Sequence, residues 1–151
     1  MEPNGENQLT AATLLFGTVR PGEGLGVVEL QGLPPLVLAY IGDAVYELWI
    51  RLQLVQGGSR RVHNLHEEAV SWVNAKSQAR ILEIWEPVLT PEEVAIVKRG
   101  RNTKSSVPRG ARMIDYRLST GLEALVGYLY LAGQWKRLES LLELAAEHGQ
   151  L

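Results

Sequence analysis

The chain has 151 residues, a formal net charge of −2 and 46% hydrophobic residues. These values suit one folded domain with its own core, and they exclude a protein whose whole surface attracts nucleic acid by positive charge. The chain has no cysteine, which excludes disulfides and thiolate zinc sites and fits a cytoplasmic protein. We expect no membrane span, because no apolar run reaches about 20 residues, and no secretory signal at the start.

The first 32 residues differ in composition from the rest of the chain. They are rich in Gly, Pro, Asn and Thr, and the runs RPGEGLG (20–26) and QGLPP (31–35) are typical of turns. We therefore expect residues 1–32 to form a partly ordered N-terminal extension, with one short element at 11–16. Residues 33–151 are expected to form the folded domain.

Helical periodicity dominates that domain. A first helix is predicted from Leu36 to about Gln56, before the Gly57-Gly58 pair. Apolar side chains at three- and four-residue steps predict the face of this helix that contacts the core: Leu38, Ile41, Val45, Leu48 and Leu52.

The remaining elements are also predicted to be helices. A second helix covers about 62–85, with a break near 73–76 or at Pro87. A third begins at Thr90, a candidate cap followed by Pro91, and ends at Gly100. A basic, irregular loop is predicted at 101–117, followed by helices at 119–133 and 134–148. No segment longer than a few residues has the two-residue period of a strand, so the predicted class is all-α.

Two carboxylates interrupt the first helix, which is otherwise largely apolar. Asp43 and Glu47 lie one turn apart, nearly opposite the predicted core stripe, among the apolar side chains Tyr40, Tyr46 and Ile50. This second side of the helix also requires cover, either from another helix or from another subunit. The two acids are either ordinary surface charges or, because a buried carboxylate requires compensation, groups with a partner or a metal.

The helix at 119–133 repeats this pattern with Glu123. Thr120 and Gly127 share its face, and small residues at that spacing let a neighbouring helix approach closely. Glu123 is then either a buried acid paired with an arginine, with Arg117 as a candidate, or one member of a cation site. Packed face to face, Asp43 and Glu123 would offer the oxygen ligands that Mg²⁺ prefers.

Positive charge is concentrated in the segment KRGRNTKSSVPRGAR (98–112), which has six basic residues and no acid. It is either a solvated loop or a surface for phosphate groups. The absence of aromatic residues argues against stacking on single strands and favours contact with the backbone of a duplex. Lys76, within a predicted apolar helix, either extends to solvent or contacts a phosphate or carboxylate. His63, His66 and Glu67 have the spacing of metal ligands, although a polar helix start explains them more simply.

Four stretches together resemble the ribonuclease III family, and in particular its reduced Mini-III branch, which lacks the double-stranded-RNA-binding domain. They are LAYIGDAVYE (38–47), VNAKSQA (73–79), KRGRNTKS (98–105) and YRLSTGLEALVGYLYL (116–131). The resemblance covers about 33–149. Leu36, Ala39 and Thr120 stand where larger family members carry further acids, and this departure is itself similar to Mini-III.

The resemblance implies an all-α, ribonuclease III-like helical bundle that forms a homodimer around a duplex RNA cleft. It implies Mg²⁺-dependent cleavage of double-stranded RNA to 5′-phosphate products, and maturation of large-subunit (23S) ribosomal RNA, with a ribosomal protein on the substrate as a further candidate partner. Asp43 and Glu123 match the metal-binding, catalytic acids, and Glu47 is a less direct ligand.

The expected RNA contacts are Lys76, Lys98, Arg99, Arg101, Asn102, Lys104, Arg109 and Arg112, and the expected dimer interface contains Tyr40, Tyr46 and Ile50. Two alternatives remain open. One is a catalytically degenerate dimer that only binds double-stranded RNA, because of the missing acids. The other is a helical scaffold unrelated to RNA.

Overall fold

A computed structural model of the chain describes residues 27–58, 61–103 and 106–149, and all regular elements in these ranges are helices. This confirms the all-α prediction. The elements are α2 (Val27–Gly32), α3 (Pro35–Gln56), α4 (Val62–Val73), α5 (Ala75–Trp85), the short 3-10 helix η1 (Glu86–Val88), α6 (Pro91–Arg101), α7 (Met113–Leu131) and α8 (Trp135–Gly149).

Local side-chain chemistry sets several helix boundaries. Asn74 separates α4 from α5: its Oδ1 accepts from the Ser77 N–H at 2.9 Å, while its Nδ2 donates to the carbonyl oxygens of Val70 and Ser71. Thr90 Oγ1 accepts from the Glu93 N–H at 3.2 Å and caps α6, as predicted. Pro35 stands at the first position of α3, where its missing N–H costs nothing.

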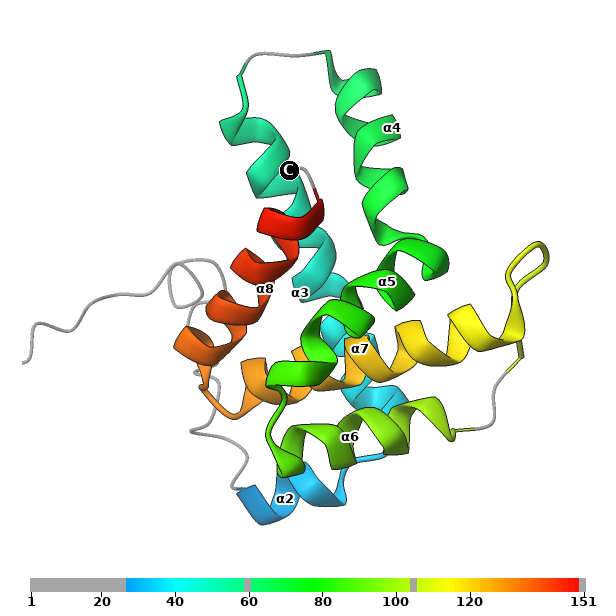
Figure 1. The fold of residues 1–151 in the computed structure, drawn as a ribbon, viewed down its shortest axis with the longest axis vertical. Helices are drawn as coiled ribbons and strands as arrows, with labels where there is room; N and C mark the ends of the chain where they lie inside the picture. The colour runs from blue at the N-terminus through cyan, green and yellow to red at the C-terminus, as the bar shows by residue number, and fades with distance from the viewer. Residues whose placement is uncertain (1–26, 59–60, 104–105, 150–151) are drawn as a thin grey trace, which may run out of the picture.

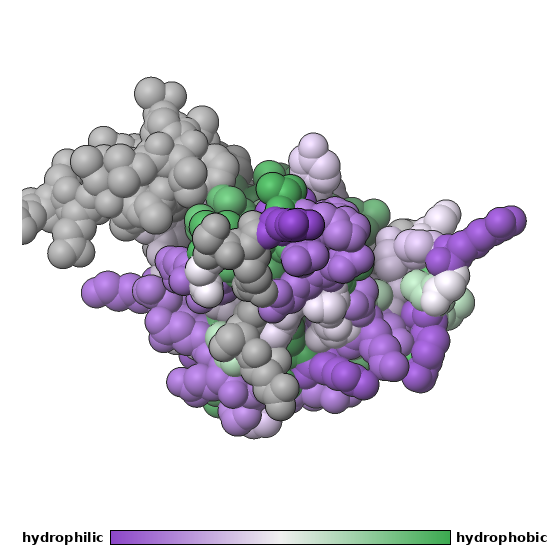
Figure 2. All heavy atoms as spheres, turned by 90° about the horizontal axis from the view of Figure 1, so that it is seen from above, coloured by the Kyte–Doolittle hydropathy of each residue, from purple (hydrophilic) through white to green (hydrophobic). Residues whose placement is uncertain are grey.

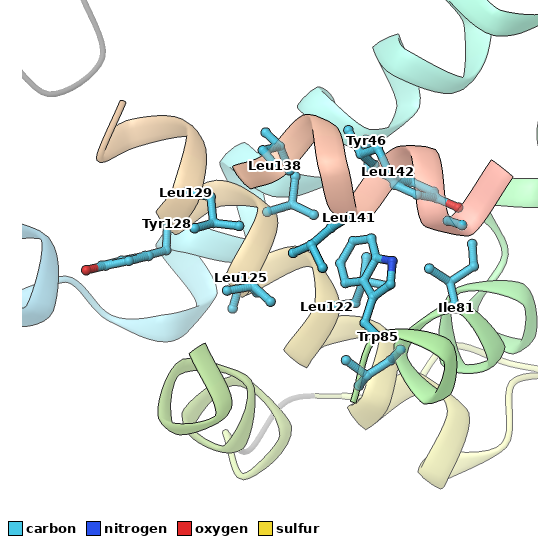
Figure 3. Close-up of a cluster of buried hydrophobic side chains, with 14 of the residues drawn as sticks. Tyr46, Ile81, Trp85, Leu122, Leu125, Tyr128, Leu129, Leu138, Leu141 and Leu142 are labelled. Carbon is cyan, nitrogen blue, oxygen red and sulfur yellow. The ribbon is translucent and has the colours of Figure 1, made fainter. Parts of the chain in front are cut away.

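Helix α7 is the centre of the molecule (Figure 1). It packs against α3, α5, α6 and α8, and α3 passes behind it in this view. Figure 3 shows how the core fills the space between α5, α7 and α8: Trp85 points into the cluster beside Leu122 and Leu141. Both leucines and the tryptophan are almost completely buried. Seen from above, the surface is mostly polar, with apolar atoms in several separate places (Figure 2).

The core face of α3 differs from the predicted stripe. Its buried residues are Leu38, Ala39, Gly42, Tyr46, Ile50 and Leu54, whereas Leu52 is 43% exposed. The periodicity was misleading because α3 contacts α4, α6 and α7, so apolar residues occur on more than one of its sides. Small residues face α7, where the two backbones come close.

Two other boundaries also differ from the sequence prediction. Helix α7 begins at Met113 rather than at Ser119, with Asp115 in its first turn, so it takes up much of the predicted loop. Residues 27–32, predicted as part of the extension, form α2, and Leu30 of this helix is buried in the core. The short element predicted at 11–16 lies outside the described residues.

Candidate active site

The site is built where α3 crosses α7. A Cβ added to Gly42 would lie 1.7 Å from the Glu123 carbonyl oxygen, and one added to Gly127 would lie 1.9 Å from the Leu38 carbonyl oxygen. The two backbones therefore touch at glycines, as the small-residue pattern around Glu123 predicted. Asp43 follows Gly42 directly, and its charge acts on the Glu123 carboxyl across this crossing.

The two carboxylates influence each other electrostatically. Burial is the main cause that raises the pKa of Glu123 to about 7, and the charge of Asp43 raises it further. Burial and the charge of Glu47 raise the pKa of Asp43. Burial and mutual repulsion both disfavour the ionised pair, so a cation placed between the acids would stabilise their ionised form.

Two polar side chains adjoin Glu123 from other sides. The Tyr46 hydroxyl donates to the Trp72 carbonyl oxygen at 3.1 Å, and burial together with the charge of Glu123 raises the pKa of Tyr46. Gln78 of α5 is fully buried, and its side-chain amide lowers the pKa of the adjoining Glu123 carboxyl. This amide nevertheless makes no hydrogen bond of acceptable length and angle.

Gln78 was not among the predicted site residues. The sequence offers one signal. Gln78 directly precedes Ala79, and both belong to the face of α5 that is buried in the core. Nothing in the sequence indicates which acid that glutamine meets.

The other acids and histidines have different partners. Glu47 Oε1 forms an ion pair with Arg51 Nη2 at 2.6 Å. On the exposed surface of α4, His63 Nε2 lies 3.2 Å from Glu67 Oε1. Arg117 is exposed, and no ion pair joins Glu123 to another described residue. Within the described ranges, no group of three or more Asp, Glu, His or Cys side chains is arranged to hold a metal. The acidic pair is thus the candidate for a cation.

The predicted RNA contacts fall into three groups. Lys98, Arg99, Arg101 and Asn102 occupy the end of α6, which lies against α7 because Gly100 meets Gly121. Arg109 and Arg112 are exposed just before α7 begins, and Lys76 is exposed in the first turn of α5, not mid-helix. Lys104 lies outside the described residues.

Arg99 differs from its neighbours because its guanidinium group already has partners. It donates to the carbonyl oxygens of Gln31 and Leu33, both at 3.1 Å. These bonds fasten the link between α2 and α3 to α6, so Arg99 has a structural role that the sequence did not indicate.

The predicted dimer interface is only partly at the surface. Tyr40 is 78% exposed, whereas Tyr46 and Ile50 are completely buried within the single chain. Including those two in the interface was wrong, because both side chains face the chain's own core. The apolar side chains that α3 does expose are Leu36, Val37, Tyr40, Leu52 and Val55.

Comparison with known proteins places this arrangement in a family. Residues 36–134 match the Ribonuclease III domain, a range that contains both acids. The chain therefore belongs to the ribonuclease III family, and it is an endoribonuclease of that family. Members of the family act on double-stranded RNA and generally use a divalent metal.

Within that family the chain is similar to curated Mini-ribonuclease 3 proteins. It is 51% identical to that of Symbiobacterium thermophilum over 76% of this chain and 89% of the relative, and 50% identical to that of a Thermoanaerobacter species over 88% and 94%. A crystal structure of a Fusobacterium nucleatum protein matches with a TM-score of 0.71 and 31% identity, over 75% of this chain and 93% of that one. None of the helices in the described ranges combines the length and hydropathy needed to cross a membrane.

Proposed function

We propose that the chain is a Mg²⁺-dependent endonuclease that cleaves double-stranded RNA, with Asp43 and Glu123 as its cation-binding, catalytic pair. The observation that carries the proposal is the glycine crossing of α3 and α7, where the charge of Asp43 acts on the Glu123 carboxyl. Maintaining two mutually repelling acids at a helix crossing reduces stability unless a cation compensates them.

The residues at the crossing fit a hard cation. Carboxylate oxygens are the protein ligands that Mg²⁺ prefers, and this ion keeps several waters, so two acids are sufficient. When bound, it would lower the pKa of a water and neutralise charge on the scissile phosphate and the leaving oxygen. Glu47, which is paired with Arg51, would contact the cation through water. This chemistry requires no covalent nucleophile, and the products would carry 5′-phosphates.

The basic residues around the crossing support contact with a duplex. Lys98, Arg101 and Asn102 end α6 beside α7, and Arg109 and Arg112 precede α7. Together with Lys76 and Lys104, they would contact phosphates, which fits recognition of duplex RNA by shape and backbone. Arg99 would act indirectly, since its guanidinium holds backbone carbonyls.

An exposed apolar stripe at the start of α3, formed by Leu36, Val37 and Tyr40, supports a homodimer. These three side chains are exposed within two turns of the helix that carries Asp43, and apolar side chains exposed together are typical of an interaction surface. Pairing this stripe with a second copy would cover it and place two acidic pairs in one assembly.

The proposed substrate is the large-subunit ribosomal RNA precursor, presented with or without a ribosomal protein, in the cytoplasm. Similarity to the Mini-ribonuclease 3 relatives supports this assignment. Asp43 and Glu123 have no third acid beside them in the described ranges, so the alternative is a dimer that binds duplex RNA without cleaving it. The cleavage assay distinguishes these two functions.

The test is cleavage of a labelled RNA duplex with and without Mg²⁺ by the wild-type protein and by Asp43→Asn. We expect product only with Mg²⁺, and none from Asp43→Asn, because its amide cannot supply the anionic ligand. Duplex binding measured in Ca²⁺ should be retained by the variant. Glu83→Gln removes an exposed charge from α5 and serves as the matched control, with cleavage unchanged.

Continued cleavage by Asp43→Asn would remove Asp43 from the catalytic pair. Duplex binding without any cleavage by the wild-type protein would instead favour the binding-only dimer.

A further inference from the structure

Gln78 is the exception on the buried face of α5. The other buried residues of this helix are apolar: Ala79, Ile81, Leu82 and Trp85. Gln78 is completely buried, and neither its Nε2 nor its Oε1 has a hydrogen-bond partner. A leucine would fill this place without the cost of burying an unpaired amide, so packing does not explain the glutamine.

The Gln78 amide adjoins Glu123, one member of the acidic pair. Helix α5 packs along α7, and the Gln78 side chain acts on the Glu123 carboxyl in the direction opposite to burial and to Asp43. That direction is the one produced by an N–H donor beside a carboxylate. The contact is open here, and hydrogen bonds of catalytic groups are often long or poorly aligned until the site is filled.

Gln78 differs from the other polar side chains that act on Glu123 in the described part of the chain. Three polar side chains act on it or are acted on by it: Asp43, Tyr46 and Gln78. Asp43 in its ionised form accepts only, and the single hydroxyl hydrogen of Tyr46 goes to the Trp72 carbonyl. Of these three, Gln78 alone brings uncommitted N–H groups.

We propose that Gln78 is a positioning residue, whose side-chain amide donates to the Glu123 carboxylate and orients it toward Asp43 for cation binding. The inference rests on the proposed function. The donated hydrogen bond fixes one carboxylate oxygen and leaves the other to face the crossing of α3 and α7. An otherwise mobile two-acid site thereby gains a preset geometry.

The test replaces the amide by a side chain of similar length and measures cation binding directly. Gln78→Met removes the N–H donors of the side-chain amide. Gln78→Leu removes them too and is measured in parallel, so that the test can be made if either variant folds. We expect the affinity of the free protein for Mn²⁺, followed by electron paramagnetic resonance, to fall about tenfold, as for loss of one hydrogen bond to a charged group. The Mg²⁺ concentration for half-maximal cleavage should rise by a similar factor.

Two further readouts separate positioning from packing. Each variant should keep a cooperative thermal unfolding transition without metal, and duplex binding in Ca²⁺ should not change. Trp85→Phe is the matched control: Trp85 Nε1 is also buried without a partner, on the same helix. That variant should keep the wild-type Mn²⁺ affinity.

Each result has one meaning. Wild-type Mn²⁺ affinity and Mg²⁺ requirement in both Gln78 variants would overturn the inference while leaving the proposed function intact. An equal loss in Trp85→Phe would also overturn it, since core disturbance would then be the cause. Absence of Mg²⁺-dependent cleavage by the wild-type protein would mean that the proposed function had failed first.

Discussion

At the scale of single residues, the site depends on two carboxylates in unequal surroundings. Asp43 is exposed, whereas Glu123 is partly buried beneath the helix crossing, with Gln78 and Tyr46 beside it. The buried member carries the larger energetic penalty when ionised. The site is therefore expected to be a source of instability when no cation is bound.

The first prediction measures this penalty through Glu123→Gln. Burial and Asp43 raise the pKa of Glu123 from 4.5 to about 7, so the folded chain holds this proton more tightly than the unfolded chain does. Ionisation of Glu123 therefore lowers the wild-type free energy of unfolding as the pH rises from 4.5 through about 7. The variant cannot ionise, so its stability relative to wild type should increase across this range by up to about 3 kcal/mol.

Denaturant unfolding at several pH values, in the presence of a chelator, gives this difference. Glu143→Gln on α8 is the control, because it removes an exposed carboxylate far along the chain from the crossing, and its difference from wild type should not vary with pH in this way. A constant difference for Glu123→Gln would show that Glu123 ionises in the fold as freely as in the unfolded chain.

At the scale of helices, the contact between Gly42 and Gly127 determines where the acids lie. Both glycines sit in regular helix, and the reason for glycine there is close approach of two backbones. A side chain on either residue would force α3 and α7 apart. The crossing thus links packing directly to the distance between the two carboxylates.

The second prediction concerns Gly42→Ala. Its Cβ would lie 1.7 Å from the Glu123 carbonyl oxygen, and a backbone atom cannot move aside by changing rotamer. We expect a loss of about 3 kcal/mol or more in the free energy of unfolding, measured by chemical denaturation. Gly32→Ala in α2 is the matched control, since a Cβ there meets nothing within 4 Å. It should be neutral or stabilising by up to about 1 kcal/mol. Equal effects of the two substitutions would contradict the close crossing.

The sequence predicted those helix features that depend on local chemistry. The Thr90 cap and the small face around Glu123 follow from residues within one or two turns, and the break at Asn74 lies at one of the two places that the sequence indicated. The core face of α3 did not follow, because a helix with neighbours on several sides has no single apolar stripe.

The same limit applies to the candidate site. The pairing of Asp43 with Glu123 was inferred from their apolar surroundings and from the family resemblance, and the crossing supports it. The burial of Tyr46 and Ile50 and the approach of Gln78 depend on how α4 and α5 fold back onto α3 and α7. Such contacts between distant segments leave no local signal in one sequence.

At the scale of the whole molecule, α3 presents an apolar stripe, formed by Leu36, Val37 and Tyr40, that is exposed in the described part of the chain. Tyr40 is the most exposed member at 78%, with Leu36 at 41% and Val37 at 43% on the same part of the helix. Burying these side chains against a second copy would contribute favourable free energy in proportion to the apolar area removed from water. The stripe is also next to Asp43, so dimerisation and the acidic site share one helix.

The last prediction tests this surface with Tyr40→Asp. A charge at the centre of a self-complementary apolar interface would be buried against its own copy, where two like charges without partners are strongly unfavourable. We therefore expect the wild-type protein to sediment as a dimer and the variant as a folded monomer, because Tyr40 contributes little to the core of its own chain. Val62→Asp provides the comparison, since Val62 of α4 is 80% exposed and lies outside the stripe, and this variant should remain dimeric. Sedimentation velocity with circular dichroism on the same samples measures both association and fold. A dimer that survives Tyr40→Asp, or a wild-type monomer, would mean that the α3 stripe is not the surface through which two copies associate.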